Sequence, residues 1–77
     1  PLRVEEEVAI IYCGVNNLLR KLKPNQVAEF QTRFLGMLNS AEKDTMDAIK
    51  AGNYNDEITT VLKNIAEDVI SAMTKKD

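Results

Sequence analysis

Carboxylate and amide side chains that could ligate a cation gather in two places in this 77-residue sequence. Three consecutive glutamates occupy positions 5–7, but consecutive residues of a helix point about 100° apart, so their carboxylates diverge. The segment 53–57 begins like a calcium-binding loop. There, Ile58 stands where the sharp turn needs glycine, and Asn64 stands where the bidentate glutamate belongs. We therefore expect no metal site, and we interpret the glutamates as the acidic first turn of a helix.

Residues that could perform nucleophilic or nucleotide chemistry are equally sparse. The sequence has no histidine, which excludes Ser-His-Asp triads, Cys-His pairs and imidazole metal sites. The one cysteine, Cys13, has no cationic neighbour in sequence that would activate its thiol, so we interpret it as a packing residue. Gly14, Gly36 and Gly52 are isolated, and no phosphate-binding loop is present. We expect no catalytic residue and no cofactor-binding residue in this segment.

The composition is that of a small globular domain. Hydrophobic residues make up 44% of the sequence and charged residues 29%, and the net charge of -2 gives no general attraction to nucleic acid or to an anionic membrane surface. The longest apolar run, from Val8 to Cys13, is much shorter than the roughly 20 residues that a membrane-spanning helix needs. Because the sequence starts with Pro1 and shows no signal-peptide pattern, we expect it to be part of a longer polypeptide.

Apolar residues at intervals of three and four predict a first helix from Val4 to Leu22. Its predicted core-facing stripe consists of Val4, Val8, Ile11, Tyr12, Val15, Leu18, Leu19 and Leu22. Pro24 is expected to end this helix, because the residue before a proline is disfavoured in the helical conformation. The basic residues Arg20, Lys21 and Lys23 would then oppose the negative end of the helix dipole.

A second apolar patch is predicted on the opposite side of this helix. Ile10 lies roughly 200° around the helix from Val8, with Cys13 and Gly14 near it. We expect this patch, Ile10, Cys13 and Gly14, to contact another domain; the alternative is that a single exposed isoleucine needs no partner.

A second helical segment is predicted after Asn25, its expected cap, and extends to Ala51. Asn39 and Ser40 compete for backbone hydrogen bonds, so the segment is either one bent helix or two shorter ones. Gly52 is expected to end it as a left-handed cap.

The last helix is predicted to begin at Asn55, its expected cap, with Lys75 and Lys76 at its C-terminal end. Its predicted stripe consists of Ile58, Val61, Leu62, Ile65, Val69 and Met73. No stretch alternates with the period of a strand. The predicted fold is all-α: residues 1–77 form a small antiparallel bundle of three to four helices that is part of a larger helical domain. Alone, a bundle of this size is expected to be only marginally stable.

The string PLRVEEEVAIIYCGVN at residues 1–16 resembles the C-terminal domain of the alpha subunit of F-type ATP synthases. In that family a proline and a large apolar residue precede a Val-Glu-Glu-Gln-Val-like start, and an Ile-Tyr, a small residue and Gly-Val follow. Phe30, Phe34 and Leu35 match its Phe-x-x-x-Phe-Leu, and the segment 54–65 resembles the final helix of bacterial members. The sequence departs from the pattern at 17–19, where Asn-Leu-Leu replaces a common Gly-Tyr-Leu, and also at Glu7 and Cys13.

The resemblance implies a structural C-terminal part of an alpha subunit, in a ring of alpha and beta subunits around a rotating central shaft. The nucleotide-binding residues, which hold ATP or ADP and Mg, would belong to a central domain upstream, so no nucleotide site is implied here. The implied partners are the rest of the alpha subunit, the beta subunit and the shaft subunits, and no nucleic acid. The parent complex would be a proton-translocating ATP synthase, peripheral to an energy-coupling membrane that this segment meets only indirectly.

Two other classes of protein compete with this interpretation. A free-standing helical adaptor would use its exposed apolar patch to bind a partner helix. A membrane-surface helix is less favoured, because the basic residues lie at helix ends and not along one polar face.

Overall fold

The structure, a computed structural model, describes residues 2–75. Pro1 and Lys76, which entered the predictions for the two ends of the sequence, lie outside the described residues. The elements in order are α1 (Val4–Val15), a short 3-10 helix η1 (Pro24–Gln26), α2 (Val27–Ala41), α3 (Lys43–Lys50) and α4 (Asp56–Thr74). No strand occurs within the described range, and the all-α prediction is confirmed.

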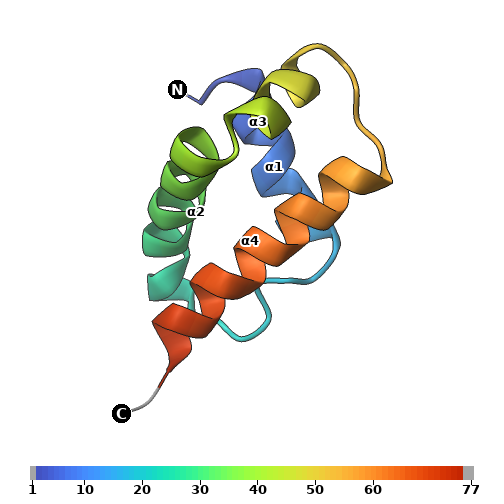
Figure 1. The fold of residues 1–77 in the computed structure, drawn as a ribbon. Helices are drawn as coiled ribbons and strands as arrows, with labels where there is room; N and C mark the ends of the chain where they lie inside the picture. Colours follow the sequence, from blue (N-terminus) through green and yellow to red (C-terminus); the bar gives the residue numbers. More distant parts are fainter. Residues whose placement is uncertain (1, 76–77) are drawn as a thin grey trace.

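The four α-helices enclose one core. In Figure 1, α2 runs upward on the left, and the long α4 crosses the front and returns downward. Both α1 and α2 pack against α3 and α4. The buried apolar residues are Ala9, Cys13, Phe30, Phe34, Leu35, Leu38, Met46, Ile49, Ile58, Leu62, Ala66, Val69 and Ile70. Within this core the rings of Phe30 and Phe34 stack with their centroids 5.1 Å apart.

Helix α1 ends at Val15, seven residues before the predicted end, and the prediction that it reaches Leu22 is wrong. The backbone turns at Asn17, whose φ of 58° is left-handed. The Leu18 amide donates to the Cys13 carbonyl at 3.0 Å, and the Asn17 amide donates to the Gly14 carbonyl at 3.2 Å. These two bonds form the Schellman arrangement that ends many helices. An asparagine therefore stops this helix, well before Pro24.

The second helical segment is two helices, which is one of the two predicted forms. The break lies at Glu42, whose backbone has φ -128° and ψ 45°, three residues beyond Asn39. Asn39 and Ser40 both remain helical, and the Ser40 hydroxyl donates to the Gly36 carbonyl at 2.8 Å. The predicted cap at Asn25 is wrong, because this residue lies inside η1.

The predicted features around the last loop are confirmed. Gly52 has a φ of 89°, and its amide donates to the Ile49 carbonyl at 3.0 Å. The side chain of Asn55 accepts a hydrogen bond from the Ile58 amide at 3.1 Å and caps α4. A left-handed glycine and a capping asparagine thus set the bounds of the loop that separates α3 from α4.

None of the helices within residues 2–75 is long and apolar enough to span a bilayer.

Candidate interaction surface

Helix α1 buries the side that the apolar pattern did not select. Its buried residues are Glu5, Ala9 and Cys13, one on each successive turn. Val4, Ile11 and Val15, which were predicted to face the core, are 68%, 60% and 78% exposed. The predicted orientation of the helix is therefore wrong at these three positions.

The exposed side of α1 is a mostly apolar strip. We call Val4, Glu7, Ile11, Gly14 and Val15 the outer face of α1; all five residues are exposed. At 100° per residue they lie within an arc of about 100°. A Cβ atom added to Gly14 would have no neighbouring atom within 4 Å, so the strip is open there. Glu7 is its one charged member.

The outer face continues into a shallow groove beside the loop that precedes α4. The groove is lined by Val8, Ile11, Tyr12, Val15, Asn16 and Tyr54. Tyr54 is 47% exposed, and desolvation, the largest cause, raises the pKa of its hydroxyl above 10.0. Apolar residues that gather in this way, and do not occur singly, are typical of a surface that contacts another protein.

The three residues predicted to make the second contact lie in different surroundings. Ile10 is partly buried against the core, Cys13 is fully buried, and Gly14 is exposed on the outer face. Burial raises the pKa of the Cys13 thiol to about 12, so the thiolate that would react is suppressed. The interpretation of Cys13 as a packing residue is confirmed. A contact of Ile10, Cys13 and Gly14 with another domain stays a prediction.

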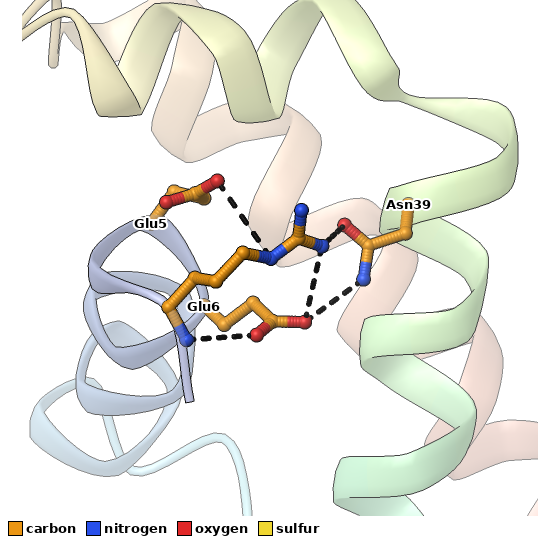
Figure 2. Close-up of polar contacts among 4 residues, drawn as sticks. Glu5, Glu6 and Asn39 are labelled. Carbon is orange, nitrogen blue, oxygen red and sulfur yellow. Dashed lines mark hydrogen bonds and ion pairs between the residues drawn. The ribbon is translucent and has the colours of Figure 1, made fainter. Parts of the chain in front are cut away.

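The glutamates of the first turn make different contacts, although Glu5 and Glu6 both lie within 4.0 Å of the Arg3 guanidinium, so the predicted divergence holds only in part. Glu6 accepts a hydrogen bond from the Arg3 backbone amide at 2.9 Å and another from the Asn39 side-chain amide at 3.0 Å (Figure 2). These bonds, the Arg3 backbone bond first, lower the pKa of Glu6 below 4.5. Glu5 is buried with a carboxylate oxygen 4.0 Å from Arg3 Nε, whereas Glu7 is exposed.

The contact between Glu6 and Asn39 could not be predicted from the sequence. Asn39 lies 33 residues beyond Glu6, and no periodic pattern links the two positions.

Over residues 2–75, no group of three or more histidine, cysteine or acidic side chains is placed to hold a metal ion.

The basic residues predicted at the end of the first helix lie outside it. Arg20, Lys21 and Lys23 follow the turn at Asn17, and the last turn of α1 contains no basic residue. The Arg20 guanidinium donates to the Asn17 carbonyl at 3.3 Å. The prediction that these charges oppose the dipole of the first helix is therefore wrong.

Comparisons with known proteins point to one family. The family described as "ATP synthase alpha/beta chain, C terminal domain" matches residues 1–69. Over 69 residues the sequence is 48% identical to the ATP synthase subunit alpha of Flavobacterium johnsoniae, an alignment that includes 90% of the 77 residues. It is 38% identical over 69 residues to that of Phocaeicola vulgatus, with 88% of the sequence aligned, and 39% identical over 70 residues to that of Parabacteroides distasonis, with 90% aligned.

The alignments span only 13% of the length of each of these three relatives. No solved structure matches the sequence.

Proposed function

The protein belongs to the family of C-terminal domains of ATP synthase alpha and beta subunits, and we propose that it is the C-terminal helical part of an alpha subunit. Its role there is structural. The segment is a packed helical end piece of the alpha/beta ring around the central shaft, in a complex that makes ATP from proton flow. ATP or ADP and Mg would be held by other parts of the alpha subunit, because this segment has no phosphate-binding loop.

The observation that carries this proposal beyond family membership is the outer face of α1. Burying one large apolar side chain stabilises a protein by about 1.5–3 kcal/mol. An isolated helical protein that leaves Val4, Ile11 and Val15 in water forgoes that stabilisation. An end piece that packs against more protein would recover that free energy. The outer face is thus the surface through which we expect this segment to dock.

The partners follow from the proposed assembly. The first is the rest of the alpha subunit, since the sequences of the relatives extend far beyond the matched part. The beta subunit and the central shaft subunits are the others. The complex would lie at an energy-coupling membrane, on the cytoplasmic side in a bacterium or its equivalent in an organelle, and this segment would meet that membrane only through the complex.

A tag placed at the C-terminal end of the complete natural gene product tests the proposal. The tagged polypeptide is purified under native conditions, its mass is measured, and its partners are identified by mass spectrometry. We expect a polypeptide much longer than 77 residues, recovered with an ATP synthase beta subunit in an assembly that hydrolyses ATP.

Recovery of a 77-residue polypeptide outside any ATP-hydrolysing assembly would contradict the proposal. In that case a single unrelated helical partner would support the free-standing adaptor, which would use the same outer face. The matched control is the same tag on the beta subunit, which should recover the same assembly if the tag itself is harmless.

A further inference from the structure

We propose that Arg3, Glu6 and Asn39 form a latch that ties the N-terminal end of α1 to the C-terminal end of α2 and so fixes how the outer face of α1 is presented. Helices α1 and α2 each pack on α3 and α4, and they are not one of the principal packed pairs. The latch therefore adds a polar link between two helices that each pack mainly on the other two. Figure 2 shows its side chains spanning from the start of α1 to α2.

The three residues form a closed ring of polar contacts. The Arg3 guanidinium donates through Nη2 to Asn39 Oδ1 at 3.1 Å, and Asn39 Nδ2 donates to Glu6 Oε2 at 3.0 Å. Glu6 Oε1 accepts from the Arg3 backbone amide at 2.9 Å, which returns the ring to its start. Arg3 Nη2 also lies 3.6 Å from Glu6 Oε2. In each contact of the ring, an N–H donor faces an oxygen acceptor.

This pattern fixes the orientation of the Asn39 amide. Turning it over would place its NH₂ against the guanidinium of Arg3 and its oxygen against the carboxylate of Glu6. The Glu6 side chain is 13% exposed, whereas the Arg3 side chain is 62% exposed and Asn39 is exposed, so solvent reaches the ring. Hydrogen bonds to charged groups are about twice as strong as neutral ones. The ring is therefore more than a local helix cap, which would need only Glu6 and the Arg3 amide.

The latch acts at a distance from the outer face of α1. Glu6 lies on the part of α1 nearer the buried side, whereas Ile11 and Val15 point outward. Holding the first turn against α2 sets the direction of the helix axis, and with it the direction in which the outer face points. That last consequence rests on the proposed function, because it matters only where a partner covers the outer face.

A charge exchange across the ring tests the latch. In Glu6→Gln, the new NH₂ faces the NH₂ of Asn39, and in Asn39→Asp two carboxylates face each other, so each single change breaks one contact. In the double variant E6Q/N39D, the amide at position 6 donates to the carboxylate at position 39, which also accepts from Arg3. The ring is complete again, with its negative charge moved from α1 to α2.

Hydrogen exchange on the complete polypeptide that carries this sequence provides the readout. We expect each single variant to speed exchange about tenfold in peptides that contain the first hydrogen-bonded amides of α1, from Glu7 onward, and in peptides from the last turn of α2, as for the loss of one charge-assisted hydrogen bond. The double variant should return to within about threefold of the parent. Asn64→Asp, at an exposed position in the middle of α4, is the control and should leave both peptides unchanged.

Two results would overturn the latch. If the single variants exchange at the same rate as the parent, the ring does not stabilise the contact between α1 and α2. If the double variant exchanges as fast as Asn39→Asp, the effect comes from the new carboxylate near the negative end of the α2 dipole, because both variants carry an aspartate at position 39. The exchange rates are read within this segment, so they stand or fall independently of whether a beta subunit is recovered.

Discussion

Glu6 is the residue in which the local and the long-range roles of the first turn meet. One carboxylate oxygen accepts a hydrogen bond from the backbone amide of Arg3, as in a helix-capping acid. The other oxygen accepts a hydrogen bond from the side-chain amide of Asn39 on α2. Both bonds favour the ionised form, which is why the pKa of Glu6 is lowered from 4.5. The charge of this one residue therefore contributes to the stability of the folded state.

The first prediction concerns the pH dependence of that contribution. Because the folded-state pKa of Glu6 lies below its unfolded value, its contribution is present above the unfolded pKa and is lost as the pH falls through the folded pKa. Urea unfolding of parent and Glu6→Gln between pH 7 and pH 3 should show the parent more stable at neutral pH. The difference should shrink below pH 4.5. Glu7→Gln is the control, since Glu7 is exposed, and a parent-to-variant difference that grew with acid would contradict the assignment.

The second prediction concerns Asn17, which ends α1 with a φ of 58°. A left-handed backbone costs a residue with a Cβ atom about 1–2 kcal/mol, less for asparagine and nothing for glycine. We expect Asn17→Gly to hold or raise the thermal midpoint and Asn17→Ala to destabilise the fold by about 1 kcal/mol. Glycine is also the residue that the resembled family commonly has at this position. Asn16→Ala and Asn16→Gly provide the matched pair at the neighbouring residue, whose φ of -92° is negative. An equal loss for Asn17→Gly and Asn17→Ala would contradict the argument.

At the scale of the elements, α4 has the most clearly marked start. Asn55 accepts from the Ile58 amide at 3.1 Å, and Asp56 and Glu57 supply negative charge to the first turn. The first backbone amides of a helix have no acceptor within the helix, and a side-chain cap accepts a hydrogen bond from one of them. Removing the cap therefore makes the start of the helix more prone to fraying.

The third prediction follows from this cap. Asn55→Ala should destabilise the fold by about 1 kcal/mol, and Asn55→Asp should restore most of the loss, because aspartate caps as well as asparagine. Thermal unfolding followed by circular dichroism measures both. Asn53→Ala, in the same exposed loop, should cost much less. A loss at position 53 equal to that at position 55 would assign the effect to the loop and not to the cap.

The elements also show what the sequence could predict. Helix α4 and the caps at Gly52 and Asn55 were predicted correctly because their signals are local: a single apolar stripe, a glycine and a capping amide. Helix α1 was placed correctly at its start but rotated wrongly. Apolar residues occupy most of its circumference, so periodicity alone could not distinguish the side that Ala9 and Cys13 bury from the side that carries Ile11.

The remaining errors have the same physical origin. The end of α1 depends on Asn17 adopting a conformation that asparagine tolerates but does not require, whereas Pro24 gives a stronger signal at the wrong place. The pairing of Glu6 with Asn39 depends on the packing of four helices, which no local pattern contains. What the sequence could not provide was thus set by tertiary contacts and by choices between similar local conformations.

At the scale of the whole molecule, the described residues are compact yet leave one apolar strip uncovered. The radius of gyration is 12.0 Å, close to the roughly 11–12 Å of a compact protein of this length. The exposure of Val4, Ile11 and Val15 therefore does not come from a loose fold. A domain this small has little stability to spare, because ordering each residue costs about 1.5 kcal/mol, which nearly cancels the gain from burial.

The fourth prediction distinguishes residues that stabilise the isolated segment from residues that are required for its assembly with a partner. The double variant Ile11→Ser/Val15→Ser changes two side chains that make little of the core, so the free energy of unfolding of the isolated segment should change by less than about 0.5 kcal/mol. Binding of an apolar-surface dye by the isolated segment should fall. In the complete polypeptide the same variant should reduce the recovery of the beta subunit on a tagged protein, since the outer face then offers a partner hydroxyls in place of apolar groups.

Met37→Ser is the matched control for that experiment. Met37 is 41% exposed and lies on α2, which is not part of the outer face, so its change should lower neither the recovery of the beta subunit nor the stability of the isolated segment. A drop in stability of the isolated double variant would mean that Ile11 and Val15 belong to the core after all. Unchanged recovery from a stable double variant would remove the outer face from the assembly. Only a stable protein that fails to assemble fits a segment whose uncovered helix face is completed by the rest of the alpha subunit and its partners.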